Sequence, residues 1–283
     1  MNRLTRILIE LALEEDLRDI GDLTSNYFVD SRHTSKGQII SRESAVISGS
    51  EVAAAVCDSV CKDLHFSIIA SDGSAVEKGE VIAEISGPTQ SILTAERTVL
   101  NFMQRLSGVA TATRRYVEKI SHTDAILLDT RKTTPGFREL EKNAVAHGGA
   151  TNHRHGLYDA VMVKDNHLAA NLSPVDLGER VRTLRSENPD LKIEVEADRI
   201  DQVEAFLKFP EIDVILLDNM TNDELRTAVE MRNQTDQGIR LEASGGVNLE
   251  TIAGIAETGV DYISVGALTH SVRSIDLGLD LAM

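Results

Sequence analysis

Cysteine is nearly absent from this sequence. Cys57 and Cys61, one helical turn apart in EVAAAVCDSVC, are the only two cysteines among 283 residues. The pair could begin a metal site, but no other cysteine is available to complete it, so we predict two free thiols on a helix. Reduced thiols are typical of a cytoplasmic protein.

Positive charge is also scarce. The chain has 29 Lys and Arg residues against 45 Asp and Glu residues, which gives a formal net charge of −16. Nucleic acids and anionic membranes both favour a broad basic face, so this deficit argues against either as the main partner. The expected partner is a small molecule.

Two further signals are missing, a long apolar run and a dinucleotide-binding fingerprint. The opening segment MNRLTRILIELALEEDL alternates charged and apolar residues at helical spacing and never holds the continuous apolar run of a signal or membrane segment. No GxGxxG motif follows a strand pattern. We therefore expect a soluble, cytoplasmic protein, and its 42% hydrophobic content is enough for a large core or a barrel with a companion domain.

The apolar pattern changes along the chain. Up to about residue 107, short strand patterns mix with helical ones, which indicates a compact α+β unit. The segment TAERTVLNFMQRLSGVATATRRYVEKI then places apolar residues at three- and four-residue steps, which predicts one helix or two in succession. From residue 125 onward, apolar runs alternate with helical segments, which predicts a parallel sheet covered by helices and favours a TIM-like barrel. Six runs read as clear strands: AILLD, AVMVK, KIEVE, DVILLD, IRLEA and DYISV.

A basic segment stands out in the acidic chain between Asp129 and His167. Arg131 and Arg154 each offer a planar fork suited to a carboxylate, so two of them suit a dicarboxylate. His153 and His155 lack the usual spacing of zinc ligands, and we expect a histidine here to donate to a carboxylate or phosphate instead. The whole segment is predicted to hold a small, highly charged anion. Its cations are Arg131, Lys132, Arg138, Lys142, Arg154 and Lys164.

Polar residues follow the predicted strands, where the active sites of α/β barrels lie. Glu196 and Asp218 could fix sugar hydroxyls or carry Mg²⁺, which prefers carboxylates together with substrate phosphate oxygens. They could equally be ion-pair partners of Lys164 and Arg131. The other residues at strand ends are Asp129, Glu194, Asn219, Ser244, Gly245, Gly246 and Gly266.

The segment ASGGVN predicts a phosphate site. Its successive backbone N–H groups would lie at the start of the next helix, with Asn248 as a helix cap, where the helix dipole is positive. The later segment VGALTHS could complete this site, because barrels often bind phosphate with their last two strand loops.

Together these motifs resemble the quinolinate phosphoribosyltransferase family over almost the whole chain. The matching segments are GDLTS, ERTVLNFMQRLSGVAT, DTRKTTPGFRELEKNAVAHGGATNHRHGLYDAVMVKDNH, EVEA, LLDNM, EASGGVN and VGALTHS. The resemblance implies an N-terminal α/β sandwich domain (1–107), followed by an incomplete, seven-stranded TIM-like α/β barrel (108–268). A C-terminal tail (269–283) could pack on the first domain.

The resemblance also implies an activity. It is the Mg²⁺-dependent conversion of quinolinate and phosphoribosyl pyrophosphate to nicotinate mononucleotide, pyrophosphate and CO₂ in NAD biosynthesis. The family's sites form between the subunits of a homodimer, which could assemble further, and Arg97 would reach into the partner subunit's site.

The remaining roles follow by matching position. Arg131, Arg154 and Lys164 would hold the carboxylates of quinolinate with His153 alongside, and Lys132 would serve the same anion cluster. Glu196 and Asp218 would hold the ribose and its Mg²⁺. The 5′-phosphate would be bound by Ser244, Gly245, Gly246, Gly266 and His270.

Three other functions remain open. Lys164 ends a strand as the Schiff-base lysine of a barrel aldolase does, so an aldolase-like enzyme is one alternative. A related phosphoribosyl-transferring enzyme is another, and a non-catalytic sensor of a phosphorylated ligand is the third.

Overall fold

The structure is a computed structural model that describes residues 1–164, 167, 174–235 and 237–281. These residues form two compact units. The first unit comprises residues 1–114, 133–149 and 268–283, and the second comprises 115–132 and 150–267. Among the described helices, none is long and apolar enough to cross a membrane.

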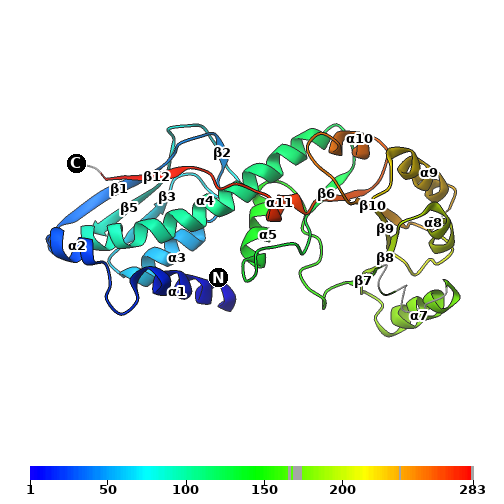
Figure 1. The fold of residues 1–283 in the computed structure, drawn as a ribbon, viewed down its shortest axis with the longest axis horizontal. Coiled ribbons are helices and arrows are strands. Elements are labelled where there is room, and N and C mark those ends of the chain that lie inside the picture. Colours follow the sequence, from blue (N-terminus) through cyan, green and yellow to red (C-terminus); the bar gives the residue numbers. More distant parts are fainter. Residues whose placement is uncertain (165–166, 168–173, 236, 282–283) are drawn as a thin grey trace. The chain divides into compact units, whose positions relative to one another are not determined.

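An antiparallel sheet forms the centre of the first unit. Its strand order is β12-β1-β5-β3, so the C-terminal strand pairs with the first strand of the chain. Helices α3 and α4 lie along one face of this sheet (Figure 1). The strands are β1 (Thr34–Ser41), β3 (His65–Ile68), β5 (Val81–Pro88) and β12 (Leu277–Leu281), and β2 (Ala45–Val46) pairs separately with β4 (Ala75–Val76).

Two helices of the first unit, α1 and α2, begin where a side chain caps free backbone N–H groups. Asn2 accepts from Thr5 N before α1, and Asp22 accepts from Ser25 N before α2. In α3, burial raises the pKa of Cys57 to about 12, which fits the predicted unreactive helix thiol. The bounds are α1 (Arg3–Leu17), α2 (Leu23–Phe28), α3 (Ser50–Val60), α4 (Thr89–Ile120), α5 (Arg138–His147) and α11 (Ala267–His270).

Helix α4 is a single helix of 32 residues, so of the two predicted alternatives, one helix or two in succession, the first is observed. It continues through Gly108, where the apolar pattern is interrupted. A Cβ added at Gly108 would lie 2.2 Å from the carbonyl oxygen of Arg273, so glycine allows the chain to cross the helix closely at this point. The expected domain boundary between residues 107 and 108 falls inside this helix.

Arg105 on α4 ties three segments of the first unit together. Its Nη2 lies 2.6 Å from Glu141 Oε1 and donates to the carbonyl oxygen of Thr269 at 2.6 Å. Its Nη1 donates to the carbonyl oxygen of Val272 at 3.1 Å. The Glu141 side chain is fully buried, so its charge depends on this guanidinium.

We expect Arg105→Ala to lower the free energy of unfolding by about 3–5 kcal/mol, because it leaves the Glu141 carboxylate buried without its cation. Urea unfolding measured by circular dichroism checks this. Arg115→Ala, which removes an exposed arginine from the same helix, should change stability by less than about 0.5 kcal/mol. An equal loss in both variants would contradict the structural role of Arg105.

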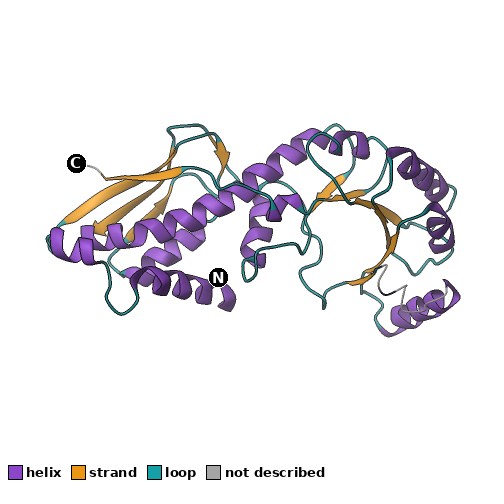
Figure 2. Ribbon diagram, viewed as in Figure 1, coloured by secondary structure: helices purple, strands orange, loops and turns teal. Residues whose placement is uncertain are grey.

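A parallel sheet forms the centre of the second unit. Its strand order is β6-β11-β10-β9-β8-β7, and all six predicted apolar runs are strands in it. The sheet is curved, with helices on its convex side (Figure 2). The strands are β6 (Ile126–Leu128), β7 (Val161–Val163), β8 (Ile193–Ala197), β9 (Val214–Asp218), β10 (Arg240–Ser244) and β11 (Tyr262–Ser264). The helices are α7 (Pro174–Glu187), α8 (Ile200–Phe206), α9 (Asn222–Asn233) and α10 (Ile252–Ala256).

The predicted mixed α/β fold with a helix-covered parallel sheet is therefore confirmed. The described residues contain six strands in this sheet. One further parallel bridge joins Thr151 to Leu128 at the free edge of β6. A single bridged residue is too short to count as a strand. The sequence around Thr151 also has no apolar run.

One face of the parallel sheet carries buried acidic residues. Glu196 on β8 and Glu242 on β10 both align with Leu216 on β9, and aligned residues of neighbouring strands project to the same face. Glu194 lies two residues before Glu196 and shares that face. All three glutamates are buried.

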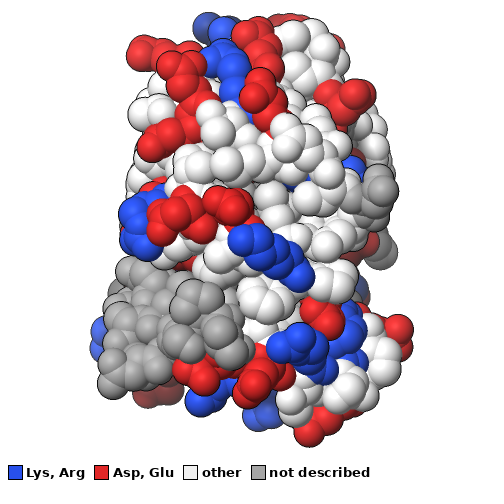
Figure 3. Space-filling view, turned by 90° about the vertical axis from the view of Figure 1, so that its right-hand side faces the viewer, with Lys and Arg blue, Asp and Glu red and all other residues white. Residues whose placement is uncertain are grey.

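On the protein surface, the face shown in Figure 3 carries acidic side chains interspersed with basic ones.

Candidate functional site

The carboxyl ends of the parallel strands bring together several predicted site residues. Lys164 follows β7, Glu196 lies near the end of β8, and Asp218 and Ser244 align at the ends of β9 and β10. The ammonium nitrogen of Lys164 lies 2.6 Å from Glu196 Oε2. The expectation that Glu196 could pair with Lys164 is thus confirmed.

Asp218 sits in an unfavourable environment for a carboxylate. Burial raises its pKa, and the negative charge of Glu196 raises it further. A hydrogen bond from Asn219 and the charges of Lys164 and Lys132 oppose this effect. Two carboxylates that repel each other at the end of neighbouring strands fit a divalent cation with oxygen ligands, so the donor set suits Mg²⁺.

Arg131 and Arg154 lie close enough to repel each other. Burial lowers the pKa of Arg154, and the positive charge of Arg131 lowers it further. Arg154 is held in place by bonds from Nη1 to the carbonyl oxygen of Ala160 (3.2 Å) and from Nη2 to Met162 Sδ (3.4 Å). The Nε of Arg131 is buried and has no hydrogen-bond partner among the described residues. A bound anion would offset the repulsion and satisfy this donor.

The loop that carries His153 and Arg154 is fixed to β6. Thr151 N donates to the carbonyl oxygen of Leu127 at 3.0 Å, and His153 N donates to Asp129 Oδ1 at 2.7 Å. Asp129 directly follows β6 and is fully buried. The strand-end aspartate therefore acts on the loop backbone.

His153 points toward two buried glutamates. Its Nε2 lies 3.1 Å from Glu194 Oε2 and 3.3 Å from Glu242 Oε2. Burial lowers the pKa of His153, but the hydrogen-bonding and charge effects of both carboxylates outweigh it and raise the pKa to about 9. Burial also raises the pKa of Glu194, while His153 opposes that rise. The hydrogen bond that Nδ1 accepts from Arg154 N opposes this rise, because a protonated Nδ1 could not accept it, and it leaves the ring proton on Nε2.

Glu242 is the residue of this cluster that sequence reasoning missed. It lies within the run IRLEA, which reads as an ordinary apolar strand. The signal that could have found it is a period of two, because Glu242 and Ser244 alternate with apolar residues just as Glu194 and Glu196 do. Charged residues at alternate positions of a buried strand indicate a polar inner face.

The predicted phosphate loop contains two glycines in the left-handed region and is followed by a short helix. Gly245 and Gly246 have φ values of 93° and 62°, and a Cβ on Gly245 would lie 2.2 Å from Asn219 Oδ1. Successive N–H groups in such a turn form an anion-binding concavity. Asn248 caps the turn that leads into the next helix: its Oδ1 accepts from the amides of Glu250 and Thr251, and its carbonyl oxygen accepts from the amide of Ile252, where the five-residue α10 starts. The turn backbone, rather than a helix dipole, is thus the source of the donors.

The basic segment is divided between the two units. Arg131, Lys132, His153, Arg154 and Lys164 lie in the second unit, together with Glu196, Asp218, Ser244, Gly245, Gly246 and Gly266. Arg138 and Lys142 belong to α5 in the first unit, where Lys142 is fully buried and thus inaccessible to a ligand from solution. The first unit also contains Arg97 and His270.

Arg97 lines a cavity of about 490 Å³ within the first unit. The cavity also contains the side chains of Asn101 and Arg105 from α4 and of Glu15 from α1. Arg97 itself is exposed. It is therefore accessible to a ligand or to another chain.

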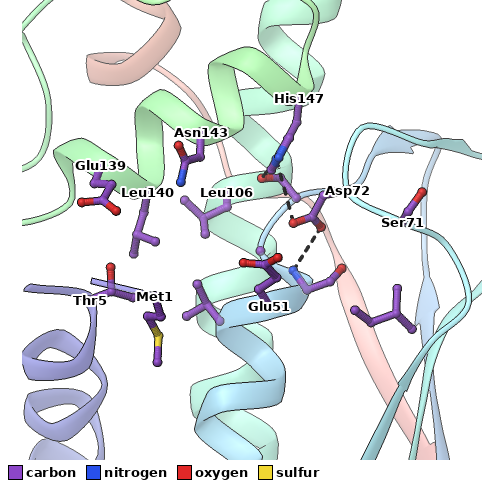
Figure 4. Close-up of a pocket in the computed structure, with 15 residues that line it drawn as sticks. Met1, Thr5, Glu51, Ser71, Asp72, Leu106, Glu139, Leu140, Asn143 and His147 are labelled. Carbon is purple, nitrogen blue, oxygen red and sulfur yellow. Dashed lines mark hydrogen bonds and ion pairs between the residues drawn. The ribbon is translucent and has the colours of Figure 1, made fainter. Parts of the chain in front are cut away.

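A second cavity of the first unit, of about 390 Å³, contains His147, Ser48 and Asp72 (Figure 4). These residue types can form a nucleophilic triad, but the geometry does not. Both Ser48 Oγ (2.9 Å) and Asp72 Oδ2 (3.9 Å) approach the same ring nitrogen, Nδ1 of His147. A triad needs the hydroxyl and the carboxylate on opposite nitrogens, so we assign no catalysis to this cavity.

Two family models match the chain. They are the quinolinate phosphoribosyl transferase N-terminal domain at residues 22–107 and the C-terminal domain at residues 109–280. The chain is 42% identical to the nicotinate-nucleotide pyrophosphorylase [carboxylating] of Mycobacterium leprae, over 98% of this chain and 96% of that protein. It is 38% identical to the probable enzyme of the same name from Bacillus subtilis, over 94% and 91%. The solved nicotinate-nucleotide pyrophosphorylase of Francisella tularensis is similar with a TM-score of 0.93 and 36% identity, over 100% and 97% of the chains.

Proposed function

Because the chain belongs to the quinolinate phosphoribosyl transferase family, we propose that it transfers the phosphoribosyl group of phosphoribosyl pyrophosphate to quinolinate. The products are nicotinate mononucleotide, pyrophosphate and CO₂, a step of NAD biosynthesis. The observation that carries this proposal is the pair Arg131 and Arg154. Two guanidinium groups that repel each other, one with a buried and unpartnered Nε, suit a dianion such as a dicarboxylate.

The transfer step requires positioning and charge stabilisation more than covalent chemistry. The bond between ribose C1 and the pyrophosphate oxygen breaks, and the pyridine nitrogen of quinolinate forms the new bond to that carbon. Arg131 and Arg154 would orient quinolinate, while Glu196 and Asp218 would hold the ribose hydroxyls beside the cationic carbon. Lys132 would face the departing pyrophosphate.

Decarboxylation needs no protein nucleophile. Once the ring nitrogen is quaternary, the positive ring stabilises the carbanion left when the 2-carboxylate departs as CO₂, and a proton then takes its place. The ammonium group of Lys164, which is ion-paired with Glu196, would act on this carboxylate by its charge. We assign no acid–base role to it.

Mg²⁺ is part of the proposal. Glu196 and Asp218 would hold it together with oxygens of phosphoribosyl pyrophosphate, and it would neutralise charge on the pyrophosphate. The carboxylate pair, in which Glu196 raises the pKa of Asp218, supports this assignment.

The proposal also includes a site for the 5′-phosphate of phosphoribosyl pyrophosphate. The residues that would bind it are Ser244, Gly245, Gly246, Gly266 and His270. The left-handed conformation of the two loop glycines supports this.

We propose a homodimer in which Arg97, exposed beside a cavity, completes the partner subunit's site. We also propose that the curved six-stranded sheet with its bridge at Thr151 is the incomplete, seven-stranded barrel of the family. Location in the cytoplasm stays a prediction.

The Schiff-base alternative is disfavoured by the contact between Lys164 and Glu196. A Schiff-base lysine attacks with the free lone pair of its amine, whereas the Lys164 nitrogen is engaged in an ion pair with Glu196 at 2.6 Å. We expect borohydride, added with a carbonyl substrate such as dihydroxyacetone phosphate, to attach nothing to Lys164. Peptide mass spectrometry measures this, and a reduced adduct on Lys164 would support an aldolase instead.

The decisive experiment incubates the purified protein with quinolinate, phosphoribosyl pyrophosphate and Mg²⁺ and measures nicotinate mononucleotide and pyrophosphate. We expect both products, with no product from nicotinate in place of quinolinate. Binding of phosphoribosyl pyrophosphate without pyrophosphate release would indicate a non-catalytic sensor. Equal use of nicotinate would indicate a related phosphoribosyl-transferring enzyme.

A further inference from the structure

The imidazole of His153 is enclosed by two strands of the second unit. Glu194 comes from β8 and Glu242 from β10, which lie on either side of β9. The exposed fractions of the three side chains are 6% for His153, 1% for Glu194 and 0% for Glu242. Burying two carboxylates is costly, so their placement around one imidazole calls for an explanation.

Every polar atom of His153 that could set its orientation has a neighbour. The backbone N donates to Asp129 Oδ1 at 2.7 Å, and ring Nδ1 accepts from Arg154 N at 2.7 Å. Ring Nε2 faces Glu194 and Glu242 at 3.1 and 3.3 Å. Neither of these two contacts has the angle of a full hydrogen bond, as expected when one proton is shared between two oxygens. Rotation of the ring would break the contacts at both nitrogens.

The position of the ring bears directly on Arg154. The amide of Arg154 is bonded to Nδ1, and its guanidinium contacts Ala160, just before β7, and Met162 in the middle of β7. The charge of Glu194 also favours the cationic form of Arg154, against burial and the charge of Arg131. Glu194 therefore acts on Arg154 both through His153 and through the electric field.

We propose that Glu194 and Glu242 are positioning residues: they lock the His153 imidazole and thereby set where the Arg154 guanidinium meets the dianionic substrate. This inference rests on the proposed function and adds two residues that do not themselves contact substrate. A displacement of about 1 Å in a group that orients the substrate can lower the rate about 10²-fold. The two glutamates would thus affect quinolinate binding through His153 and Arg154, without contacting quinolinate themselves.

A metal ion is the rival explanation of the same cluster, because the three ligand atoms all lie within 4.8 Å of one another. The bond from Arg154 N to Nδ1 argues against it. An imidazole whose Nδ1 accepts a hydrogen bond carries its proton on Nε2, and a protonated Nε2 cannot bind a metal. In this arrangement Nδ1 accepts from Arg154 N and the proton on Nε2 faces the two carboxylates, so the ring has no lone pair left for an ion.

The test compares Glu242→Ala with Glu242→Gln, which keeps an acceptor oxygen at the same place. We expect Glu242→Ala to raise the KM for quinolinate about 10²-fold and to leave the KM for phosphoribosyl pyrophosphate nearly unchanged. Glu242→Gln should recover most of the loss. Glu230→Ala, at an exposed position of α9, is the matched control and should behave as wild type. Equal losses in the Ala and Gln variants, or equal shifts of both KM values, would overturn the proposal.

A double-mutant cycle shows whether the effect passes through His153. In a His153→Ala background, Glu242→Ala should cause no further rise in the quinolinate KM, and an additive rise would count against positioning. If Glu242→Ala does not fold, the same cycle is run with Glu194→Ala, which removes the other carboxylate that faces Nε2. ¹⁵N-edited NMR of the wild type should show a slowly exchanging ring N–H of His153, and its absence would also sink the proposal.

Two further outcomes are distinguishable. Wild-type protein that forms no nicotinate mononucleotide would remove the proposed function and this inference together. Product formation with an unchanged quinolinate KM in Glu242→Ala would remove the inference alone. One equivalent of a transition metal in the wild type, lost in Glu242→Gln, would establish the metal site in its place.

Discussion

Arg131→Ala is expected to abolish measurable quinolinate binding while phosphoribosyl pyrophosphate still binds. The Nε of Arg131 is buried without a partner among the described residues, and the group repels Arg154. Both features are unfavourable until an anion arrives. Hydrogen bonds to charged groups contribute about 1.5–3 kcal/mol each. A two-pronged contact is therefore worth a loss of about 10²-fold or more in affinity when it is removed.

Isothermal titration calorimetry with each substrate separately measures this effect. Arg131→Lys keeps the charge but loses the planar fork, so its affinity for quinolinate should lie between those of Arg131→Ala and the wild type. Arg180→Ala, an exposed position on α7, is the matched control and should bind both substrates normally. Equal weakening of both substrates in Arg131→Ala would mean that the residue serves the pyrophosphate or the fold, and the dicarboxylate assignment would have to be withdrawn.

The sequence predicts the parallel sheet well because its signals are local. Each of the six strands is a short apolar run with a charged residue, a serine or a glycine at or just after its end, and the strand-end rule places Lys164, Glu196, Asp218 and Ser244 together. Helix α4 is predicted from its apolar spacing in the same way. These features depend on residues that are close in the chain, so a single sequence contains them.

The features that the sequence does not predict depend on long-range contacts. Strand β12 pairs with β1 across more than two hundred residues, and its short LGLDL pattern has meaning only beside that partner. Gly108 interrupts the apolar pattern of α4 because the backbone of Arg273 crosses there. Neither contact could be inferred from the local pattern.

The candidate site shows the same division. Arg131 and Arg154 could be proposed as carboxylate ligands from their chemistry alone. Glu242 could not, because its importance comes from alignment with Glu196 through Leu216 and from a loop histidine that reaches both strands. Register between strands decides which alternate residues share a face, and a sequence does not state register. For this reason the residues that contact a ligand, such as Arg131 and Arg154, are easier to predict from sequence than the residues that position them, such as Glu242.

Asp218→Asn is expected to lower kcat/KM for phosphoribosyl pyrophosphate by about 10²–10³-fold, as does the loss of one preorganised electrostatic group in other enzymes. It should not lower the melting temperature. Burial and the charge of Glu196 raise the pKa of Asp218. A carboxyl group with a raised pKa in the folded state makes ionisation less favourable there than in the unfolded chain. At pH values above that pKa, the neutral amide removes a destabilising charge.

Glu196→Gln provides the contrast that makes this prediction specific. It also removes a proposed Mg²⁺ ligand, so a loss of activity similar to that of Asp218→Asn is expected. It breaks the 2.6 Å ion pair with Lys164 as well, so its melting temperature should fall below that of Asp218→Asn. Differential scanning calorimetry at neutral pH, with Asp190→Asn as an exposed control, measures the difference. If Asp218→Asn melted well below the wild type, the Asp218 carboxylate would stabilise the fold. The argument that this charge lowers stability while it serves metal binding would then be wrong.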